Sequence, residues 1–224
     1  MISDIFVDFY TKLFSSSNVQ GLDRVLEGVK RVVTANMNEE LLKAYSKDEV
    51  EATIRQMAPS KAPSPDGLPP LFYQTFWKSI RVEVSNAILS CLNSGTLLKS
   101  RNHTFITLIP KVSNPKNVSK FKLISLCNAL YKILSKVIAN RLKPILNSIV
   151  SKAQSAFTVD RLITNNILIA FESLHYMKTR CSSKEGFMAL KLDMSKAYDG
   201  VERHFLEKIL LRMGFQESWV AMIK

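Results

Sequence analysis

The segment most suggestive of chemistry is a short alternating stretch, residues 187–194, that contains an aspartate. Its even-numbered residues are apolar and would share one face of a β-strand, whereas Asp193 would lie on the other face. A carboxylate at the end of a strand can bind a hard cation, and Mg²⁺ is commonly held by one or two carboxylates together with substrate phosphates. The residue types therefore predict a strand over 187–194 and a metal-binding role for Asp193.

A second carboxylate, Asp199, follows in the same motif and allows two interpretations. The run Asp199-Gly200-Val201-Glu202 has the pattern of a helix capping box, in which the first side chain caps the helix that follows. A metal-dependent phosphoesterase that uses Asp193 and Asp199 together is the alternative. The cap explains Asp199 more simply, so we rank the phosphoesterase last.

Two lysines flank a predicted β-hairpin. Residues 104–110 are short and β-branched, residues 113–119 form a loop, and residues 121–126 provide a second strand. Antiparallel pairing would bring Lys111 and Lys122 near one another, where two ammonium groups could hold a triphosphate. Exposed lysines at strand ends fit the same pattern equally well, and the spacing alone leaves both interpretations open.

The composition is that of a basic globular chain. The 224 residues are 46% hydrophobic and 22% charged, with a net charge of +12, which suits one large or two small domains. Such an excess favours a polyanionic partner, nucleic acid before a membrane surface, and the lack of a Lys/Arg block favours a folded basic face over a basic tail. A basic protein without such a partner is the alternative.

Several other classes of site find no support in the sequence. The three cysteines are far apart with no C-x-x-C spacing, which argues against a disulfide framework or zinc ribbon and suits a reducing compartment. The three histidines show no metal-binding spacing. The sequence shows no secretory signal and no apolar run near the ~20 residues that span a bilayer, so we expect no membrane association and a nuclear or cytoplasmic location.

The rest of the pattern is mostly helical. A proline-rich run, residues 59–70, interrupts it; composition favours a linker, and a loop that lays Lys61 on a phosphate backbone is the alternative. Helical spacing of apolar residues predicts helices over residues 4–14, 23–33, 46–57, 71–93, 130–142, 162–179, 205–213 and from 219 onward, with Pro144 ending the fifth of these or starting a new turn.

Six ordered motifs together make the sequence resemble the reverse transcriptases of plant LINE-type (non-LTR) retrotransposons. One of them alone would be a weak signal, whereas six in order are a strong one. The motifs are Lys61-Ala62-Pro63-Ser64-Pro65-Asp66-Gly67, Leu108-Ile109-Pro110-Lys111, Phe121-Lys122-Leu123-Ile124-Ser125-Leu126-Cys127-Asn128, Ala139-Asn140-Arg141-Leu142, Gln154-Ser155-Ala156-Phe157, and Leu192-Asp193-Met194-Ser195-Lys196-Ala197-Tyr198-Asp199.

The resemblance implies an α+β, mostly helical right-hand polymerase, of which this chain holds the fingers and the first part of the palm. It implies that Asp193 is catalytic and holds Mg²⁺ with a later aspartate pair, helped by the Met194 carbonyl. It implies that Tyr198 crowds the sugar 2′ position and selects deoxynucleotides. The implied binding residues are Lys111 and Lys122 for the triphosphate, and Lys61, Gln154 and Arg161 for the template strand.

The sequence departs from the family pattern at several positions. Lys122 replaces an arginine and keeps the charge but loses the bidentate fork, which weakens the triphosphate contact. Asp160 replaces a glycine and puts an acid where a template phosphate should pass. Arg203 replaces a tryptophan, and Ser64 replaces a glycine. The Tyr-Ala-Asp-Asp motif with the remaining metal carboxylates would lie beyond Lys224.

We therefore expect the reverse transcriptase domain of a non-LTR retrotransposon, truncated at its C-terminus. Residues 1–58 would be an N-terminal helical extension and residues 59–224 the polymerase domain. An RNA template, a DNA primer, deoxynucleoside triphosphates and Mg²⁺ would be its partners, but one carboxylate cannot hold two metal ions, so this chain is expected to be inactive. The alternative is a non-catalytic nucleic-acid-binding remnant of the fingers. An unpaired motif strand would also expose apolar surface and lower solubility.

Overall fold

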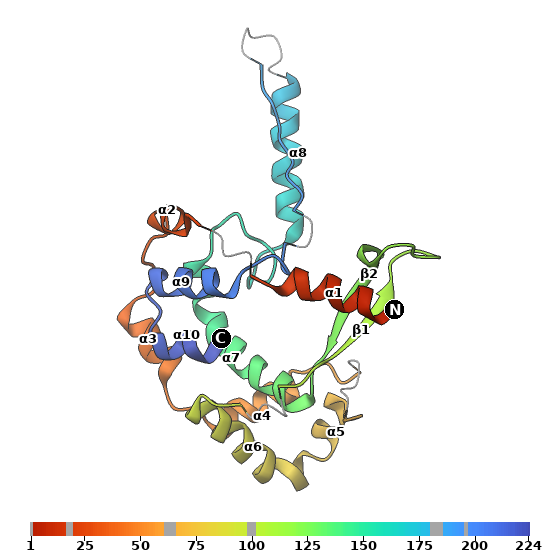
Figure 1. The fold of residues 1–224 in the computed structure, drawn as a ribbon. Helices are drawn as coiled ribbons and strands as arrows, with labels where there is room; N and C mark the ends of the chain where they lie inside the picture. Colours follow the sequence, from red (N-terminus) through yellow and green to blue (C-terminus); the bar gives the residue numbers. More distant parts are fainter. Residues whose placement is uncertain (1, 17–19, 61–65, 98–101, 180–185, 195–196) are drawn as a thin grey trace. The chain divides into compact units, whose positions relative to one another are not determined.

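The computed structural model describes residues 2–16, 20–60, 66–97, 102–179, 186–194 and 197–224 (Figure 1). The chain divides into two compact units, one of Met1–Arg141 with Glu202–Lys224 and the other of Leu142–Val201. Within the described ranges the structure is mostly helical, with one two-stranded sheet. The mostly helical α+β class predicted from the sequence is confirmed.

Helices form most of the larger unit. The 21-residue helix α7 (Ala129–Ile149) begins there and continues through Pro144 into the smaller unit, which also holds α8 (Ile163–Thr179). None of the described helices combines the length and the apolar character that a membrane crossing requires. The remaining helices are α1 (Ile2–Phe14), α2 (Leu22–Glu27), α3 (Ala35–Leu42), α4 (Lys47–Arg55), α5 (Pro70–Thr75), α6 (Trp77–Ser94), α9 (Arg203–Met213) and α10 (Glu217–Ile223).

Local signals explain where several of these helices begin and end. At α4 the Glu49 N–H donates to the Ser46 hydroxyl oxygen at 3.2 Å and the Ser46 N–H donates to the Glu49 carboxylate at 2.8 Å, which completes the predicted capping box. Gly95 and Gly214 end α6 and α9 in the left-handed conformation, at φ 64° and 99°. The helices predicted over residues 4–14, 46–57, 130–142, 162–179, 205–213 and from 219 onward are confirmed. Pro144 does not end the helix over 130–142, because α7 continues through it to Ile149 with one backbone donor fewer.

Two predicted helices need new bounds, and one helix was not predicted. The helix expected over residues 23–33 stops at Glu27, just before Gly28. The helix expected over residues 71–93 is two helices that meet at Phe76. The sequence pattern also missed α3, a short helix whose start is capped by the Thr34 hydroxyl, which accepts the Met37 N–H at 3.2 Å. Short helices with few apolar residues give little periodicity to read.

The main core of the larger unit joins helices α4, α5, α6 and α7. Its most deeply buried side chains, Val50, Ile54, Ile88, Ile133 and Val137, are each at most 1% exposed. Helix α4 precedes the predicted boundary at residue 59 and the other three follow it, so a single core spans that boundary. The boundary itself stays a prediction about where the polymerase function begins.

A second packed region joins early and late parts of the larger unit. Helices α3 and α10 contact each other, and Leu41 and Trp219 there are at most 1% exposed. The Asn38 side-chain amide donates to the Gly214 carbonyl at 2.8 Å, and its oxygen accepts the Gln216 N–H at 3.0 Å. A buried amide must find such partners, because an unsatisfied one is costly. Asn38 therefore ties residues separated by more than 170 positions.

The predicted hairpin is confirmed. Strands β1 (Phe105–Pro110) and β2 (Phe121–Leu126) pair antiparallel, with Phe105 opposite Leu126 and Pro110 opposite Phe121. The single-turn 3-10 helix η2 (Val118–Lys120) lies in the connection just before β2. The Phe6 ring of α1 meets the Phe121 ring edge-on, with centroids 5.2 Å apart.

The strand predicted over residues 187–194 is wrong. These residues carry no strand pairing among the described parts of the chain, and Leu190 and Leu192 are 72% and 79% exposed. A strand exists only when its backbone N–H and C=O groups find a partner strand, so an alternating pattern is insufficient by itself. Helix α8 of the same unit has the predicted span, yet none of its residues is buried.

Candidate functional site

The hairpin brings together the two lysines predicted to bind a triphosphate. Lys122 stands opposite Ile109 in the strand register, and Lys111 directly follows the last residue of β1. The Lys111 N–H donates to the Lys120 carbonyl at 2.8 Å, which extends the pairing by one position. Lys111 and Lys122 are therefore diagonal cross-strand neighbours, with backbones roughly 7–8 Å apart.

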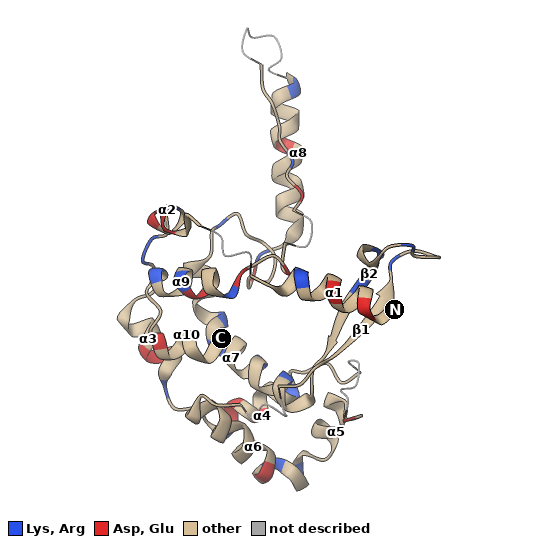
Figure 2. Ribbon diagram, in the orientation of Figure 1, with Lys and Arg blue, Asp and Glu red and all other residues tan. Residues whose placement is uncertain are grey.

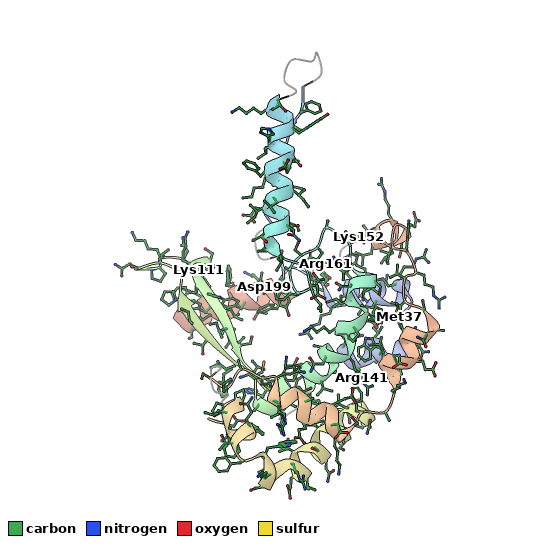
Figure 3. The ribbon with its side chains drawn as sticks, turned by 180° about the vertical axis from the view of Figure 1, so that it is seen from behind. Met37, Lys111, Arg141, Lys152, Arg161 and Asp199 are labelled. Carbon is green, nitrogen blue, oxygen red and sulfur yellow. The ribbon has the colours of Figure 1, made fainter. Side chains whose placement is uncertain are left out.

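Both side chains are open to solvent, and Figure 3 shows Lys111 at the hairpin. The two side chains are exposed, and the Lys111 ammonium makes one hydrogen bond, to the Ser119 carbonyl at 3.3 Å. Lys116 and Lys120 are exposed in the same connection. The chemistry available is multivalent electrostatic attraction of phosphate oxygens by point charges.

The excess positive charge of the protein arises from one stretch of the sequence that has no acidic residues. Between Glu83 and Asp160 the sequence has no aspartate or glutamate, and the remaining twenty basic residues nearly match all nineteen acids. Figure 2 shows that the hairpin and α7 carry Lys and Arg (blue) and no Asp or Glu (red). This stretch therefore supplies almost the whole net charge through Lys99, Arg101, Lys111, Lys116, Lys120, Lys122, Lys132, Lys136, Arg141, Lys143 and Lys152.

Asp193 lies in the smaller unit on an exposed segment without regular structure. Met194 beside it is 76% exposed, and Tyr198 is 93% exposed in a turn over residues 197–200. No three His, Cys, Asp or Glu side chains gather into a metal-binding cluster within the described ranges. The ligands present there do not fit a two-metal centre, which needs several carboxylates held together.

The capping prediction for Asp199 is wrong. Helix α9 begins at Arg203, four residues further on, and its N-cap residue is Glu202. Asp199 instead lies in the turn over residues 197–200, where the Val201 N–H donates to the Tyr198 carbonyl at 3.4 Å. The capping-box pattern failed because the chain turns once more before the helix starts.

Gln154 and Arg161 come together in the connection between α7 and α8. The Arg161 guanidinium donates to three main-chain carbonyls, those of Asn147 at 3.2 Å, Ser151 at 2.5 Å and Gln154 at 2.8 Å. The Gln154 amide donates to the Ala156 carbonyl at 3.1 Å. Arg161 thus fixes the shape of this loop, and part of its hydrogen-bond donors are engaged in these contacts.

Two residues of this loop have left-handed backbones, which explains one departure from the family pattern. Asp160 has φ 60°, a conformation that glycine adopts without strain and aspartate tolerates. Phe157 has φ 63°, and its ring is 98% exposed. A bulky residue held in this conformation and fully exposed is a candidate for contact with a ligand, which the sequence pattern did not single out.

The Ala139-Asn140-Arg141-Leu142 motif serves the fold. The Arg141 side chain is 10% exposed and forms a bidentate pair with the Glu49 carboxylate, at 2.8 and 3.0 Å. It also donates to the carbonyls of Leu41, Lys43 and Ala44, and its guanidinium stacks 3.6 Å from the centre of the Tyr45 ring. The partners lie almost a hundred residues away, so local sequence could not reveal them.

This cluster shifts two titrations. Burial favours the neutral form of the Glu49 carboxyl, but hydrogen bonds from Arg141 and from the Ser46 N–H outweigh it and hold the pKa of Glu49 below its ordinary value. Burial raises the pKa of the Tyr45 phenol, and the Arg141 charge opposes that rise. Glu49 is therefore held as the charged partner of Arg141.

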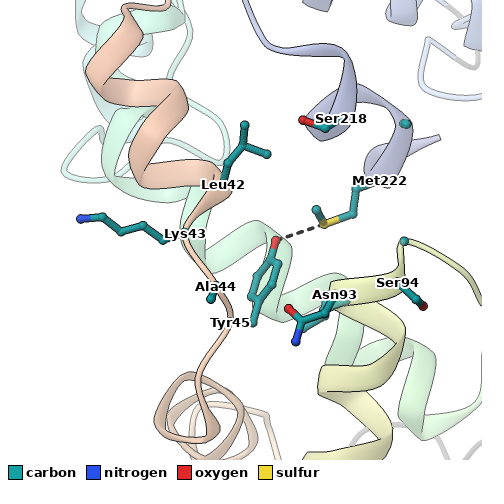
Figure 4. Close-up of a pocket in the computed structure, with 11 residues that line it drawn as sticks. Leu42, Lys43, Ala44, Tyr45, Asn93, Ser94, Ser218 and Met222 are labelled. Carbon is teal, nitrogen blue, oxygen red and sulfur yellow. Dashed lines mark hydrogen bonds between the residues drawn. The ribbon is translucent and has the colours of Figure 1, made fainter.

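A pocket of about 320 Å³ opens beside this cluster (Figure 4). Leu42, Tyr45, Asn93 and Met222 are among its lining residues, and the Tyr45 hydroxyl donates to the Met222 sulfur at 3.1 Å. None of the residues predicted from the sequence to bind nucleotide, template or metal lines it. The pocket is a gap where α6 and α10 end beside the segment between α3 and α4.

Comparison with known proteins identifies the class. Residues 109–224 match the family described as "Reverse transcriptase (RNA-dependent DNA polymerase)", and this range covers more than half of the chain and includes most of the hairpin. The chain therefore belongs to the reverse transcriptase family. Lys61 of the sequence prediction precedes this range and lies outside the described residues.

Two relatives are similar over most of the chain. The "Transposon TX1 uncharacterized 149 kDa protein" of Xenopus laevis is 28% identical over 218 residues, which is 96% of this chain and 16% of that protein. The "Retrovirus-related Pol polyprotein from type-1 retrotransposable element R2" of Popillia japonica is 26% identical over 175 residues, 77% of this chain and 23% of that protein. The chain thus spans less than a quarter of either relative.

Proposed function

We propose that this reverse transcriptase domain belongs to a non-LTR retrotransposon of the plant LINE type and takes part in copying RNA into DNA in the nucleus or cytoplasm. The observation that carries the proposal is the basic hairpin within the family-matched range, since its diagonal lysine pair has the charge and spacing to hold a triphosphate. The transposon relatives support the element class. The substrates would be an RNA template, a DNA primer and deoxynucleoside triphosphates.

The nucleotide would be bound from the hairpin side by Lys111 and Lys122. Their ammonium groups would neutralise phosphate oxygens, while Tyr198 would exclude a ribose 2′-hydroxyl. Lys122 offers one point charge where an arginine would offer a fork, so we expect nucleotide binding to be weak.

The catalytic carboxylate would be Asp193, with the Met194 carbonyl as an additional metal ligand. In a polymerase Mg²⁺ supplies electrostatic stabilisation of the transferred phosphoryl group. Among the described residues no three His, Cys, Asp or Glu side chains gather around a metal position, so we propose that residues 1–224 alone do not extend a primer.

The template would contact the loop between α7 and α8. Gln154 and the exposed ring of Phe157 present a polar group and a stacking surface, and Arg161 holds the loop in shape while adding positive charge. Lys61 would add a phosphate contact from the proline-rich segment. The hairpin that would bind the nucleotide and the loop that would bind the template would belong to the fingers and palm of a right-hand polymerase.

The test is primer extension on an RNA template with Mg²⁺ by the natural chain, Asp193→Ala and Asp199→Ala. We expect no extension by any of the three. Extension by the natural chain and by Asp199→Ala, but not by Asp193→Ala, would confirm the role of Asp193 and refute the proposed inactivity.

A non-catalytic nucleic-acid-binding protein is the second candidate, and the acid-free stretch favours it. Binding of the same primed template over a salt series separates the candidates, because the logarithm of the binding constant falls with the logarithm of salt concentration by about 0.9 per phosphate contact. Steep salt dependence without nucleotide-dependent tightening supports the second candidate. Tightening by the matching deoxynucleotide, lost in Lys111→Ala, supports the first.

A further inference from the structure

Two arginines from distant parts of the sequence line one open pocket in the larger unit. The pocket has a volume of about 580 Å³ and lies between the segment after α2, the start of α3 and the connection from α9 to α10. Arg31, Arg212 and Gln216 are among its lining residues, and no acidic residue lines it. None of the residues proposed to bind nucleotide, template or metal is part of it.

The walls of the pocket are fixed by main-chain hydrogen bonds. The N–H groups of Val32 and Val33 both donate to the Met213 carbonyl, at 3.0 and 2.9 Å. The Asn38 side chain also bonds this connection, donating to the Gly214 carbonyl and accepting the Gln216 N–H. The segments that carry the two arginines are therefore held against each other before a ligand arrives.

Gly214 sets the position of Arg31. Its φ of 99° favours glycine, and a Cβ placed on it would come within 2.9 Å of the Arg31 Cγ and Nε atoms. The aliphatic stem of Arg31 thus lies directly on the Gly214 backbone. Such packing limits the freedom of the guanidinium, which lowers the entropy cost of binding an anion.

Neither guanidinium has another partner in the part of the chain that the structure describes. No ion pair or hydrogen bond engages the side chain of Arg31 or Arg212 there. The ion pairs on α9, Lys208 with Asp23 at 3.9 Å and Glu207 with Lys224 at 2.9 Å, include neither arginine. Two forked, unpaired cations in one hollow match the oxygens of a phosphate group.

We propose that this pocket binds a phosphate group through Arg31 and Arg212, as a second anion site apart from the basic hairpin. The phosphate could belong to a nucleic-acid backbone or be a free ion such as the pyrophosphate that polymerisation releases. The chemistry of recognition is the same for both, since each presents several charged oxygens to two guanidinium forks.

The test measures binding of three probes to the natural chain, Arg31→Gln, Arg212→Gln and the double variant at fixed ionic strength. The probes are pyrophosphate, a 5′-phosphorylated single-stranded RNA 12-mer and the same RNA without its 5′-phosphate. Arg55→Gln is the matched control, because it removes the same charge from an exposed arginine outside this pocket. Circular dichroism melting checks that each variant folds.

We expect each single variant to weaken binding roughly threefold and the double variant about tenfold, with Arg55→Gln unchanged. An effect on pyrophosphate points to a free or terminal phosphate, and an effect confined to both RNA probes points to the backbone. Natural affinity in the double variant for all three probes overturns the proposal, as does an equal loss in Arg55→Gln. If Arg31→Gln does not fold, Arg212→Gln decides, because its side chain carries no such packing on Gly214.

Discussion

Replacing Arg141 should destabilise the larger unit far more than replacing an exposed arginine. Arg141→Ala removes both hydrogen bonds to the Glu49 carboxylate, three bonds to main-chain carbonyls and the stacking on Tyr45. Removing one partner of a buried ion pair costs about 3–5 kcal/mol. The Glu49 side chain is 35% exposed and regains some hydration, so we expect the lower end, about 3 kcal/mol.

Thermal unfolding followed by circular dichroism measures this loss. At about 2–4 °C per kcal/mol for a domain of this size, Tm should fall by about 6–12 °C. Arg55→Ala is the control, because its pair with Glu51 at 2.6 Å has side chains 72% and 35% exposed and should contribute at most about 0.5 kcal/mol.

A double-mutant cycle isolates the pair itself. Arg141→Met combined with Glu49→Gln should lose less stability than the sum of the two single changes, by about 1–3 kcal/mol, because each single variant leaves the other group without its partner. An Arg141→Ala protein that melts within about 2 °C of the natural chain would refute the reasoning. It would mean that the three carbonyls and Glu49 are satisfied by water at little cost.

Three further predictions follow from other contacts. The folded pKa of Glu49 is depressed, so its stabilising contribution is complete above the ordinary carboxyl pKa and is lost as pH falls through the folded value. The difference in unfolding free energy between the natural chain and Glu49→Gln, measured by urea unfolding, should therefore shrink on acidification. The same difference should not change between pH 7 and pH 8. Gly214→Ala should cost about 1–3 kcal/mol in the same assay, because its φ of 99° and the Arg31 contact both resist a side chain, while Gly28→Ala, at a right-handed helix end, should change stability by less than about 1 kcal/mol. Arg161→Ala should speed proteolysis and amide exchange within residues 147–161 and leave exchange in α4 unchanged. Exchange in residues 147–161 at the rate of the natural chain would show that the three carbonyl contacts do not hold the loop.

The sequence predicts elements whose signals are local. The Ser46 capping box and the hairpin depend on residues that lie within a few positions or one turn of each other, and both are present as expected. The Lys111 and Lys122 juxtaposition follows from the register, so it was within reach of sequence reasoning. Their roles in binding nucleotide stay predictions.

What the sequence could not supply depends on distant partners. The stretch over residues 187–194 has the right alternation for a strand, but strand formation requires a neighbour that local sequence does not specify. Arg141 carries a charge on a helix, and local sequence does not identify its ion-pair partner Glu49, which is more than ninety residues earlier. The same holds for Asn38, which is 4% exposed on a helix that the sequence pattern did not predict and whose partners lie more than 170 residues later.

The ties between Asn38, Val33 and the α9–α10 connection have a consequence for how the chain folds during its synthesis. A ribosome releases Val33 and Asn38 long before Met213 and Gly214, so the early segment must wait for about 180 residues before its hydrogen-bond partners exist. Contacts of such sequence separation form late and slow folding. The early part of the larger unit should therefore stay open to proteases and chaperones on the ribosome until α10 emerges, and the contact that closes it would be among the last to form.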